Sequence, residues 1–295
     1  MKNTLLSVTT ALLLIATSCT KSHTKTVDSN VNSKEDTTTQ SIEQQKSISL
    51  NRVLENENIT IQSIDQHTWH GFGNLCFNES VYLIEGNNCA MLIDAGVRMP
   101  GLRKIAEELV HNKPVKLYLS HLHSDHAGSA INEWDELWIN SADLAMFPKF
   151  AESYKGKIHF MNDGEEIKLG NRNIDIVFTP GHTPGSTSFI DREAKYGFSA
   201  DAFGSTNLLV FTNLSTEIAT CHRMNLLIER YGITHLFPGH NDGDNIETPK
   251  RVKDVGEICL GIMNGQYEPK SVISNLNLVV EDRGVKINYT KDRIK

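Results

Sequence analysis

The segment His121-Leu122-His123-Ser124-Asp125-His126 is the most informative part of this chain. It directly follows an apolar run, residues 115–120 (VKLYLS), that reads as a buried strand. Loops that leave strands commonly display functional side chains. Imidazole nitrogens and carboxylate oxygens are ligands for zinc and similar divalent metals. The segment therefore predicts a metal site, against the alternative of a solvated, histidine-rich turn.

Three later loops offer further ligands of the same kind. They are residues 179–186 (TPGHTPGS), 198–203 (FSADAF) and 236–240 (LFPGH), and each places a His or Asp just after a short apolar run. Gly and Pro beside these side chains fix unusual loop backbones and permit close approach. A site for two metals needs about six or seven ligands, which one loop cannot supply. The four loops together could supply them.

The order of these motifs resembles that of the metallo-β-lactamase superfamily of metal hydrolases. The motifs are H-x-H-x-D-H, PGHTPGS, SADAF and PGH, and residues 92–96 (LIDAG) are similar to the family's first motif. The resemblance covers about residues 58 to 290. It implies two divalent metal ions, which we expect to be zinc, with iron or manganese compatible with the same ligand types.

The resemblance also implies a role for each matching position. The first metal would be held by three histidines and the second by one aspartate and two histidines, with a further aspartate bridging the two ions. In that order these residues are His121, His123, His182, Asp125, His126, His240 and Asp201.

Three positions near the ligands carry additional expectations. Asp125 is the candidate catalytic residue, because it would orient a metal-bridging hydroxide as well as bind the second metal. Asp94 would support the ligand loop without being a ligand. Ala200 departs from the family pattern, in which glycine is common before the bridging aspartate.

The ligand types predict a branch of the family and a reaction. Asp201 makes the chain similar to the glyoxalase-II-like branch, because the β-lactamases usually have Cys or Ser there. The expected activity is hydrolysis of a small ester, thioester, lactone or lactam. Two alternatives stay open: a phosphodiester hydrolase, and a non-catalytic metal-binding protein of the same fold. Only 55 residues follow His240, so the long helical extension that serves glutathione substrates is not expected.

The first residues predict export and a lipid anchor. Residues 1–18 begin with Met-Lys and carry an apolar stretch over residues 5–15, which is too short to span a bilayer and fits a signal peptide. Small residues before Cys19 resemble a bacterial lipoprotein cleavage box; an ordinary signal peptide is the alternative. A lipid on Cys19 would hold the chain at a membrane surface, as a lipoprotein of the bacterial cell envelope.

Composition divides the remainder into a tether and one domain. Residues 19–50 are almost entirely polar, which predicts a flexible tether, and residues 51–295 are long enough for one sizeable hydrolase domain. The net charge of −7 provides no basic surface for nucleic acid, so the expected partner is a small-molecule substrate. The oligomeric state is left open. None of the remaining cysteines (Cys76, Cys89, Cys221 and Cys259) lies in a C-x-x-C pattern, so we expect no cysteine metal site.

Hydrophobic patterns predict an α/β chain. Strands are expected near residues 58–63, 80–85, 89–93, 115–120, 136–139, 174–178, 186–190, 196–200 and 234–237, with a hairpin over residues 276–289. Helical periodicity occurs over residues 102–110, 218–231 and 252–263. Strands interspersed with helices suggest sheets covered by helices. The resemblance implies their arrangement, a four-layer αββα sandwich of two mixed sheets flanked by helices.

Six further histidines are expected to be ordinary surface or loop residues: His67, His70, His111, His159, His222 and His235. The segment 67–74 (HTWHGFGN) falls between the first two expected strands, where family members carry a loop beside the metals. Its aromatic residues could form a substrate wall or could equally be plain loop packing.

Overall fold

The computed structural model describes residues 51–241 and 245–295. The first half of this part of the chain forms a mixed sheet of eight strands in sequence order. Strands β1 to β5 pair antiparallel, whereas β5 to β8 pair parallel. The strands are β1 (Asn51–Glu55), β2 (Thr60–Asp65), β3 (Thr68–Phe72), β4 (Ser80–Glu85), β5 (Ala90–Ile93), β6 (Val115–Tyr118), β7 (Glu136–Ile139) and β8 (Lys157–Phe160).

The second half supplies two smaller sheets. The five-stranded sheet has the order β14-β12-β11-β10-β9, and the four-stranded sheet has the order β13-β17-β16-β15. The strands are β9 (Glu166–Lys168), β10 (Asn173–Phe178), β11 (Thr187–Asp191), β12 (Tyr196–Ala200), β13 (Asn207–Leu209), β14 (His235–Pro238), β15 (Lys270–Ser271), β16 (Leu278–Asp282) and β17 (Val285–Tyr289).

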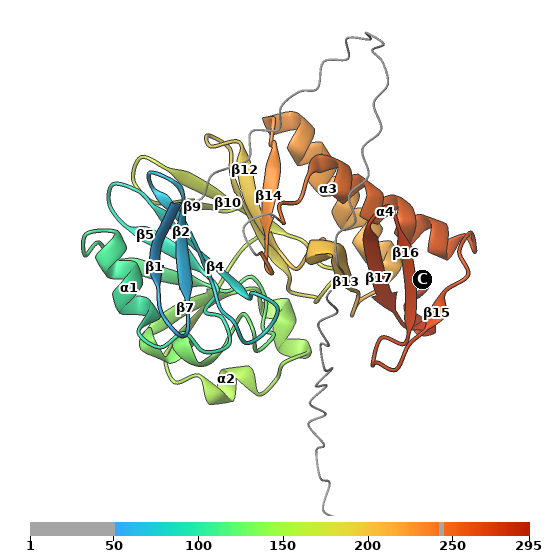
Figure 1. Ribbon diagram of the computed structural model, residues 1–295, viewed down its shortest axis with the longest axis horizontal. Helices are drawn as coiled ribbons and strands as arrows, with labels where there is room; N and C mark the ends of the chain where they lie inside the picture. Colours follow the sequence, from blue (N-terminus) through green and yellow to red (C-terminus); the bar gives the residue numbers. More distant parts are fainter. Residues whose placement is uncertain (1–50, 242–244) are drawn as a thin grey trace, which may run out of the picture. The chain divides into compact units, whose positions relative to one another are not determined.

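Helices cover the outer faces of these sheets (Figure 1). Helix α1 (Leu102–Leu109) packs its apolar side on the eight-stranded sheet, and the short helix α2 (Phe150–Ser153) lies beside the same sheet. Helices α3 (Leu214–Tyr231) and α4 (Pro249–Met263) lie side by side and cover the other sheets.

Three hydrophobic clusters correspond to the three interfaces between these layers. One joins α1 to the eight-stranded sheet, and another joins α3 and α4 to the sheets of the second half. The third lies between the two larger sheets, where Tyr82 and Ile93 of the first meet Phe189, Phe198 and Phe237 of the second. Burying each such side chain stabilises the fold by about 1.5–3 kcal/mol. The αββα architecture that the family resemblance implies is confirmed, although hydrogen bonding divides the strands into three sheets rather than two.

The strand directions explain why distant motifs meet. Strands β5 and β6 are parallel neighbours, and so are β12 and β14. Strand β10 runs in the same direction as β12, because each is antiparallel to β11, which lies between them. The carboxyl ends of β10, β12 and β14 therefore share one edge of their sheet, and the loops that leave these strands can converge.

The segment 67–74 differs from its sequence prediction. Residues Thr68–Phe72 form strand β3 in the middle of a sheet, not a loop. Trp69 belongs to the core, and His70 is fully buried and stacked on Tyr82, with ring centroids 5.0 Å apart. Burial lowers the pKa of His70 to about 3, so its ring is neutral. The expectation of a surface or loop histidine was wrong for His70, because alternating aromatic and small residues also suit a buried strand.

The remaining predicted elements agree with the structure, some short elements were not predicted, and the predictions for the first 50 residues lie outside the described part of the chain. The three helices and the C-terminal hairpin are present, and α3 begins four residues before its predicted start. Strands β1, β8, β9, β13 and β15 and helix α2 were not predicted, because they are short and weakly patterned. The signal peptide, Cys19 and the whole tether lie outside the described residues. Within those residues, no helix is long and apolar enough to cross a membrane.

Candidate metal centre

The predicted ligand residues come together at the ends of four strands. His121, His123, Asp125 and His126 follow β6, His182 follows β10, Asp201 follows β12, and His240 follows β14. All seven belong to groups of His and Asp side chains whose potential ligand atoms lie within 4.8 Å of one another.

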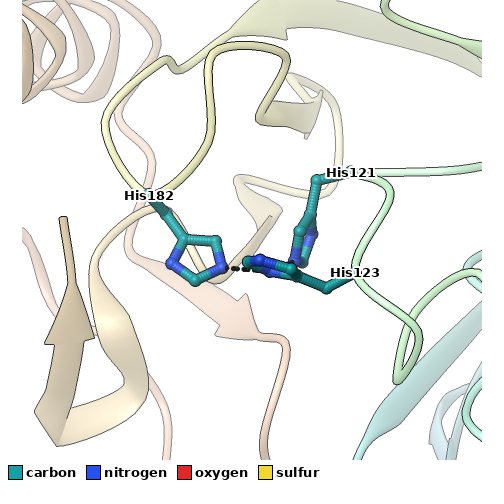
Figure 2. A group of neighbouring side chains, drawn as sticks. All are labelled: His121, His123 and His182. Atoms are coloured by element: carbon teal, nitrogen blue, oxygen red, sulfur yellow. Dashed lines mark hydrogen bonds between the residues drawn. The ribbon is translucent and has the colours of Figure 1, made fainter. Parts of the chain in front are cut away.

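The first group consists of His121, His123 and His182 (Figure 2). Nδ1 of His123 lies 3.0 Å from Nε2 of His121 and 2.9 Å from Nε2 of His182. Three imidazole nitrogens therefore point at one small volume, and this donor set suits a divalent transition metal.

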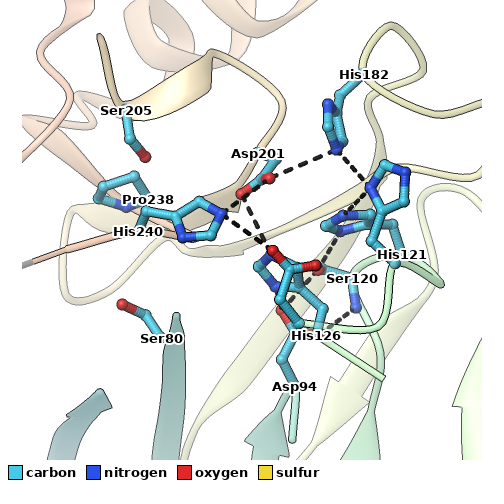
Figure 3. A network of polar contacts seen from close by, with 12 residues as sticks. Ser80, Asp94, Ser120, His121, His126, His182, Asp201, Ser205, Pro238 and His240 are labelled. Atoms are coloured by element: carbon cyan, nitrogen blue, oxygen red, sulfur yellow. Dashed lines mark hydrogen bonds and ion pairs between the residues drawn. The ribbon is translucent and has the colours of Figure 1, made fainter. Parts of the chain in front are cut away.

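The second group consists of Asp125, His126 and His240, and Asp201 lies between it and the first group (Figure 3). Oδ2 of Asp201 lies 3.3 Å from Nε2 of His240 and 3.5 Å from Nε2 of His182. One carboxylate thus reaches both groups, which is the position that a bridging ligand requires.

Hydrogen bonds on the far side of three imidazole rings aim their Nε2 atoms inward. Nδ1 of His182 donates to the Leu209 carbonyl at 2.8 Å, and Nδ1 of His240 donates to the Cys76 carbonyl at 3.1 Å. Nδ1 of His126 donates to Oδ2 of Asp94 at 2.9 Å. Such bonds fix the tautomer of a ligand histidine and leave Nε2 free to bind metal.

Protonation at the site follows from burial and from charge. Burial lowers the pKa of His121 well below the usual histidine range, and it lowers the pKa of His123 to about 4. Burial opposes protonation of His126 too, but the carboxylates of Asp201 and Asp94 raise its pKa well above the usual range. For Asp201, His126 and His240 outweigh burial and hold the carboxyl pKa well below its usual value. The first group is therefore neutral imidazole, the form that binds metal.

Two buried atoms test whether a metal fits. Nε2 of His126 and Oδ1 of Asp201 are both buried and have no hydrogen-bond partner among the described residues. Buried polar atoms normally have hydrogen bonds, and these two lie 3.5 Å apart, where they form an ion pair only if His126 is protonated. A divalent cation would satisfy both atoms with His126 neutral. Together with the donor types, these atoms fit a divalent cation.

Asp94 makes contacts of a supporting kind. It lies at the end of β5 with φ of 65°, a left-handed conformation that Asp tolerates better than most residues. Its carboxylate accepts hydrogen bonds from the Ser120 amide and hydroxyl, both at 2.7 Å, as well as from His126. Asp94 belongs to none of the ligand groups.

Asp143 is a second support, and the sequence analysis did not identify it. This buried carboxylate accepts from the Leu122 amide at 2.9 Å and from the Gly185 amide at 2.5 Å. It therefore joins the loop of His121 to the loop of His182. In the sequence, Asp143 looks like an ordinary acidic residue in a turn, so no local signal distinguishes it.

A cavity of about 490 Å³ opens onto both groups. Its wall includes His123, Asp125, His182, Asp201 and His240, together with three apolar side chains, Phe77, Leu209 and Phe211. No Lys or Arg from the described part of the chain lines it.

Two other wall residues were not predicted from the sequence. The thiol of Cys76 donates to Oδ2 of Asp125 at 3.3 Å, and Ser205 lies on the wall near Asp201 and His240.

All four cysteines of the described residues are free thiols; Cys221 and Cys259 are buried, whereas Cys76 and Cys89 are only partly buried.

The family model of the metallo-beta-lactamase superfamily matches residues 75–240, and the chain belongs to this superfamily of metal-dependent hydrolases. The acyl-coenzyme A thioesterase MBLAC2 of Gallus gallus is 25% identical over 203 residues, which cover 55% of this chain and 72% of the relative. The hydroxyacylglutathione hydrolase GloC of Haemophilus influenzae is 34% identical over 128 residues, which cover 38% of this chain and 60% of the relative.

Solved structures share the fold at low sequence identity. A metallo-beta-lactamase from Pontibacter korlensis superimposes with a TM-score of 0.55 and 14% identity, covering 69% of this chain and 99% of that chain. A metallo-beta-lactamase family protein from Thermus thermophilus gives 0.52 and 14%, covering 70% and 85%. The family membership makes the chain a hydrolase, so the alternative of a non-catalytic binding protein is not retained.

Proposed function

We propose that the chain uses two divalent metal ions to hydrolyse a small uncharged ester, thioester, lactone or lactam. Zinc is the metal that we propose for both positions. The observation that carries this proposal is the pair of ligand groups connected by Asp201, together with the cavity that opens onto both. A single cavity can thus present one substrate to both candidate metal positions.

The ligand side chains would bind the metal ions, and one of them, Asp125, would also orient the attacking water. Two ions held there would lower the pKa of a water molecule between them and polarise the oxygen of the scissile group. Asp125 lines the cavity, and although burial opposes it, His126 lowers the pKa of its carboxyl, so that the carboxylate is ionised. An ionised carboxylate only accepts hydrogen bonds, which suits Asp125 to orient the attacking water.

The wall of the cavity favours an uncharged substrate. Carboxylates and phosphates are usually recognised by Arg or Lys, and neither lines the cavity within the described residues. Phe77, Leu209 and Phe211 offer apolar surface for an acyl chain or ring. Recognition of an anionic group would therefore fall to the two cations and not to a side chain of the described wall.

Asp201 and the relatives support the glyoxalase-II-like branch over the β-lactamases. Asp201 lies where it would bridge the two ions, and the relatives include proteins named as an acyl-coenzyme A thioesterase and a hydroxyacylglutathione hydrolase. These names favour a thioester or a related acyl compound. GloC matches only 38% of this chain, so its name alone does not assign a substrate to the whole chain.

A substrate panel tests the proposal. Protein loaded with zinc, manganese or iron is assayed on chromogenic esters, thioesters, lactones, a cephalosporin and a phosphodiester, with neutral and carboxylate-bearing members of each acyl class. Asp201→Asn serves as the matched site control. We expect the highest kcat/KM on a neutral acyl substrate and little turnover by the control. A preference for the phosphodiester, or equal rates for Asp201→Asn, would refute the proposal.

A further inference from the structure

A short stretch of the cavity wall has an unusual backbone. Gly204, Ser205 and Thr206 have φ angles of 78°, 45° and 94° in succession. Glycine adopts positive φ freely, but Ser and especially the β-branched Thr do so rarely. Strained residues of this kind persist only where the surrounding structure holds them, and they concentrate at functional sites.

Two side chains from the segment after β14 hold the backbone of Ser205. The buried carboxylate of Glu247 accepts from the Ser205 amide at 3.0 Å and also from the Ser199 hydroxyl at 2.5 Å. The Asn245 side-chain amide donates to the Ser205 carbonyl at 3.0 Å and to the His240 carbonyl at 3.1 Å. The strained residue is therefore tied to the segment that carries His240.

The hydroxyl of Ser205 remains without a partner. The residue is only 8% exposed, and no described atom makes a hydrogen bond with Oγ. Buried hydroxyls are normally satisfied, and Ser usually finds a backbone partner nearby. Ser205 instead lines the cavity, and Figure 3 shows its side chain on the same side of the polar network as His240 and Asp201.

We propose that Ser205 is a substrate-binding residue, whose hydroxyl donates a hydrogen bond to an uncharged acceptor of the bound substrate, such as its acyl carbonyl oxygen. This inference rests on the proposed function for its substrate class. A neutral donor matches a neutral acceptor, and the hydrogen bonds with Glu247 and Asn245 hold Ser205 at the cavity wall. The same backbone in a purely structural role would leave Oγ bonded to the protein.

Two variants separate the hydroxyl from the backbone. Ser205→Ala removes the hydroxyl and retains the strain, whereas Ser205→Gly removes the hydroxyl and relieves the strain. The Gly variant should therefore melt at a higher temperature than the Ala variant. We expect both to lower kcat/KM by about three- to tenfold on the best neutral substrate, as for loss of one uncharged hydrogen bond to an oxygen that gains charge in the transition state.

A binding measurement gives a second readout that does not depend on turnover. Calorimetry with an alkyl trifluoromethyl ketone on zinc-loaded protein should show affinity reduced by about three- to tenfold in both variants, at unchanged zinc content. If kcat/KM and ketone affinity follow the melting temperature, or stay at the wild-type values, the assignment of Ser205 is overturned. A wild type that binds the ketone but cleaves no panel substrate would count against the proposed function alone.

Discussion

Gly239 packs directly against the carboxylate of Asp201, so that a β-carbon on Gly239 would overlap Oδ1 of Asp201 and lie 2.8 Å from Cε1 of His126. Two candidate metal ligands from different loops thus depend on the absence of a side chain at a third position. The Gly239 amide also donates to the Ala200 carbonyl at 2.8 Å, which keeps the loops after β12 and β14 in contact.

Gly239→Ala should therefore damage the metal centre without altering any ligand. The new methyl group has to displace Asp201 or His126, because the Ala200 backbone blocks the other direction. We expect metal content to fall from two ions toward one and kcat/KM to fall by about 10- to 100-fold. Elemental analysis and kinetics on the same preparation measure both. Gly265→Ala is the matched control. At a φ of 68° an alanine destabilises the fold by about 1 kcal/mol through backbone strain, and a β-carbon there meets no neighbouring atom. If the control loses as much metal, general destabilisation explains the result.

Asp125→Asn and Asp94→Asn should separate ligand from support. Asp125 lies at the cavity, so its amide variant should keep the fold and the first ion but lose the second ion and most activity. Asp94 is buried and accepts three hydrogen bonds through its two oxygens. In Asp94→Asn one of those oxygens becomes an NH2 group, which cannot accept, so at least one donor loses its partner. Asp94→Asn should therefore lower the melting temperature and weaken metal binding by about 10- to 100-fold together. Circular dichroism melts and metal counts distinguish the two. Wild-type turnover by Asp125→Asn with both ions bound would contradict its role.

Asp143→Asn tests the brace between two ligand loops. One oxygen of Asp143 serves Leu122 and the other serves Gly185, so an amide nitrogen at either position leaves one backbone N–H unpaired. The expected loss is about 1–3 kcal/mol of unfolding free energy, accompanied by weaker binding of the first ion. Urea titration and zinc competition with a chelator measure these quantities. Asp135→Asn, at a fully exposed carboxylate that contacts Arg103 of α1, should leave zinc affinity unchanged.

The candidate ligands could be identified from the sequence because each lies in a short motif that is recognisable by itself. His121, His123 and Asp125 share one loop, and the other ligands each follow an apolar strand and sit next to Gly, Pro or a small residue. Strand direction then brings these loops to one edge. The same reasoning located the helices and most of the sheet, because those elements carry clear hydrophobic periodicity.

The supports could not be predicted because their contacts join positions far apart in the chain. Asp143 contacts Gly185 across 42 residues, and Ser205 contacts Glu247 across the same separation. The residues around His70 suit a loop as well as a strand, and only the pairing of β3 with β4 decides between the two. The backbone of Ala200 could not be predicted either. Its φ of 47° explains why glycine suits that position, but the sequence alone shows only a small residue there.

The predicted lipid anchor is tested through Cys19. The wild-type chain expressed in bacteria should partition with membranes and incorporate a labelled fatty acid, because a lipid on Cys19 supplies the anchor. Cys19→Ala should incorporate no label and appear in the soluble fraction when exported. Cys89→Ala controls for the loss of a thiol elsewhere in the chain. Identical fractionation of wild type and Cys19→Ala as soluble protein would show that the lipoprotein prediction is wrong.

Glu217 should make stability depend on pH. This glutamate of α3 is completely buried beneath the loop of His182, where a β-carbon on Gly181 would overlap Oε2, and its one hydrogen bond to a side chain comes from the Cys221 thiol at 3.4 Å. Burial raises its pKa from 4.5 to about 8, and burial likewise raises the pKa of Glu247 to about 7. The folded state therefore holds these protons more tightly than the unfolded state does.

The sign of the effect follows from that difference. Glu217 contributes fully to stability below pH 4.5, and the contribution is lost as pH rises through about 8, by an amount on the order of a few kcal/mol. Glu217→Gln stays neutral at every pH, so its unfolding free energy should fall less between pH 5 and pH 9 than that of the wild type, with Glu247 and the histidines of the metal centre accounting for the remaining slope. Urea unfolding of chelator-treated protein at both pH values removes the pH dependence of metal binding from the comparison. Glu229→Gln, on an exposed part of the same helix, should follow the wild type. Parallel pH profiles for wild type and Glu217→Gln would show that the buried carboxyl does not titrate in this range.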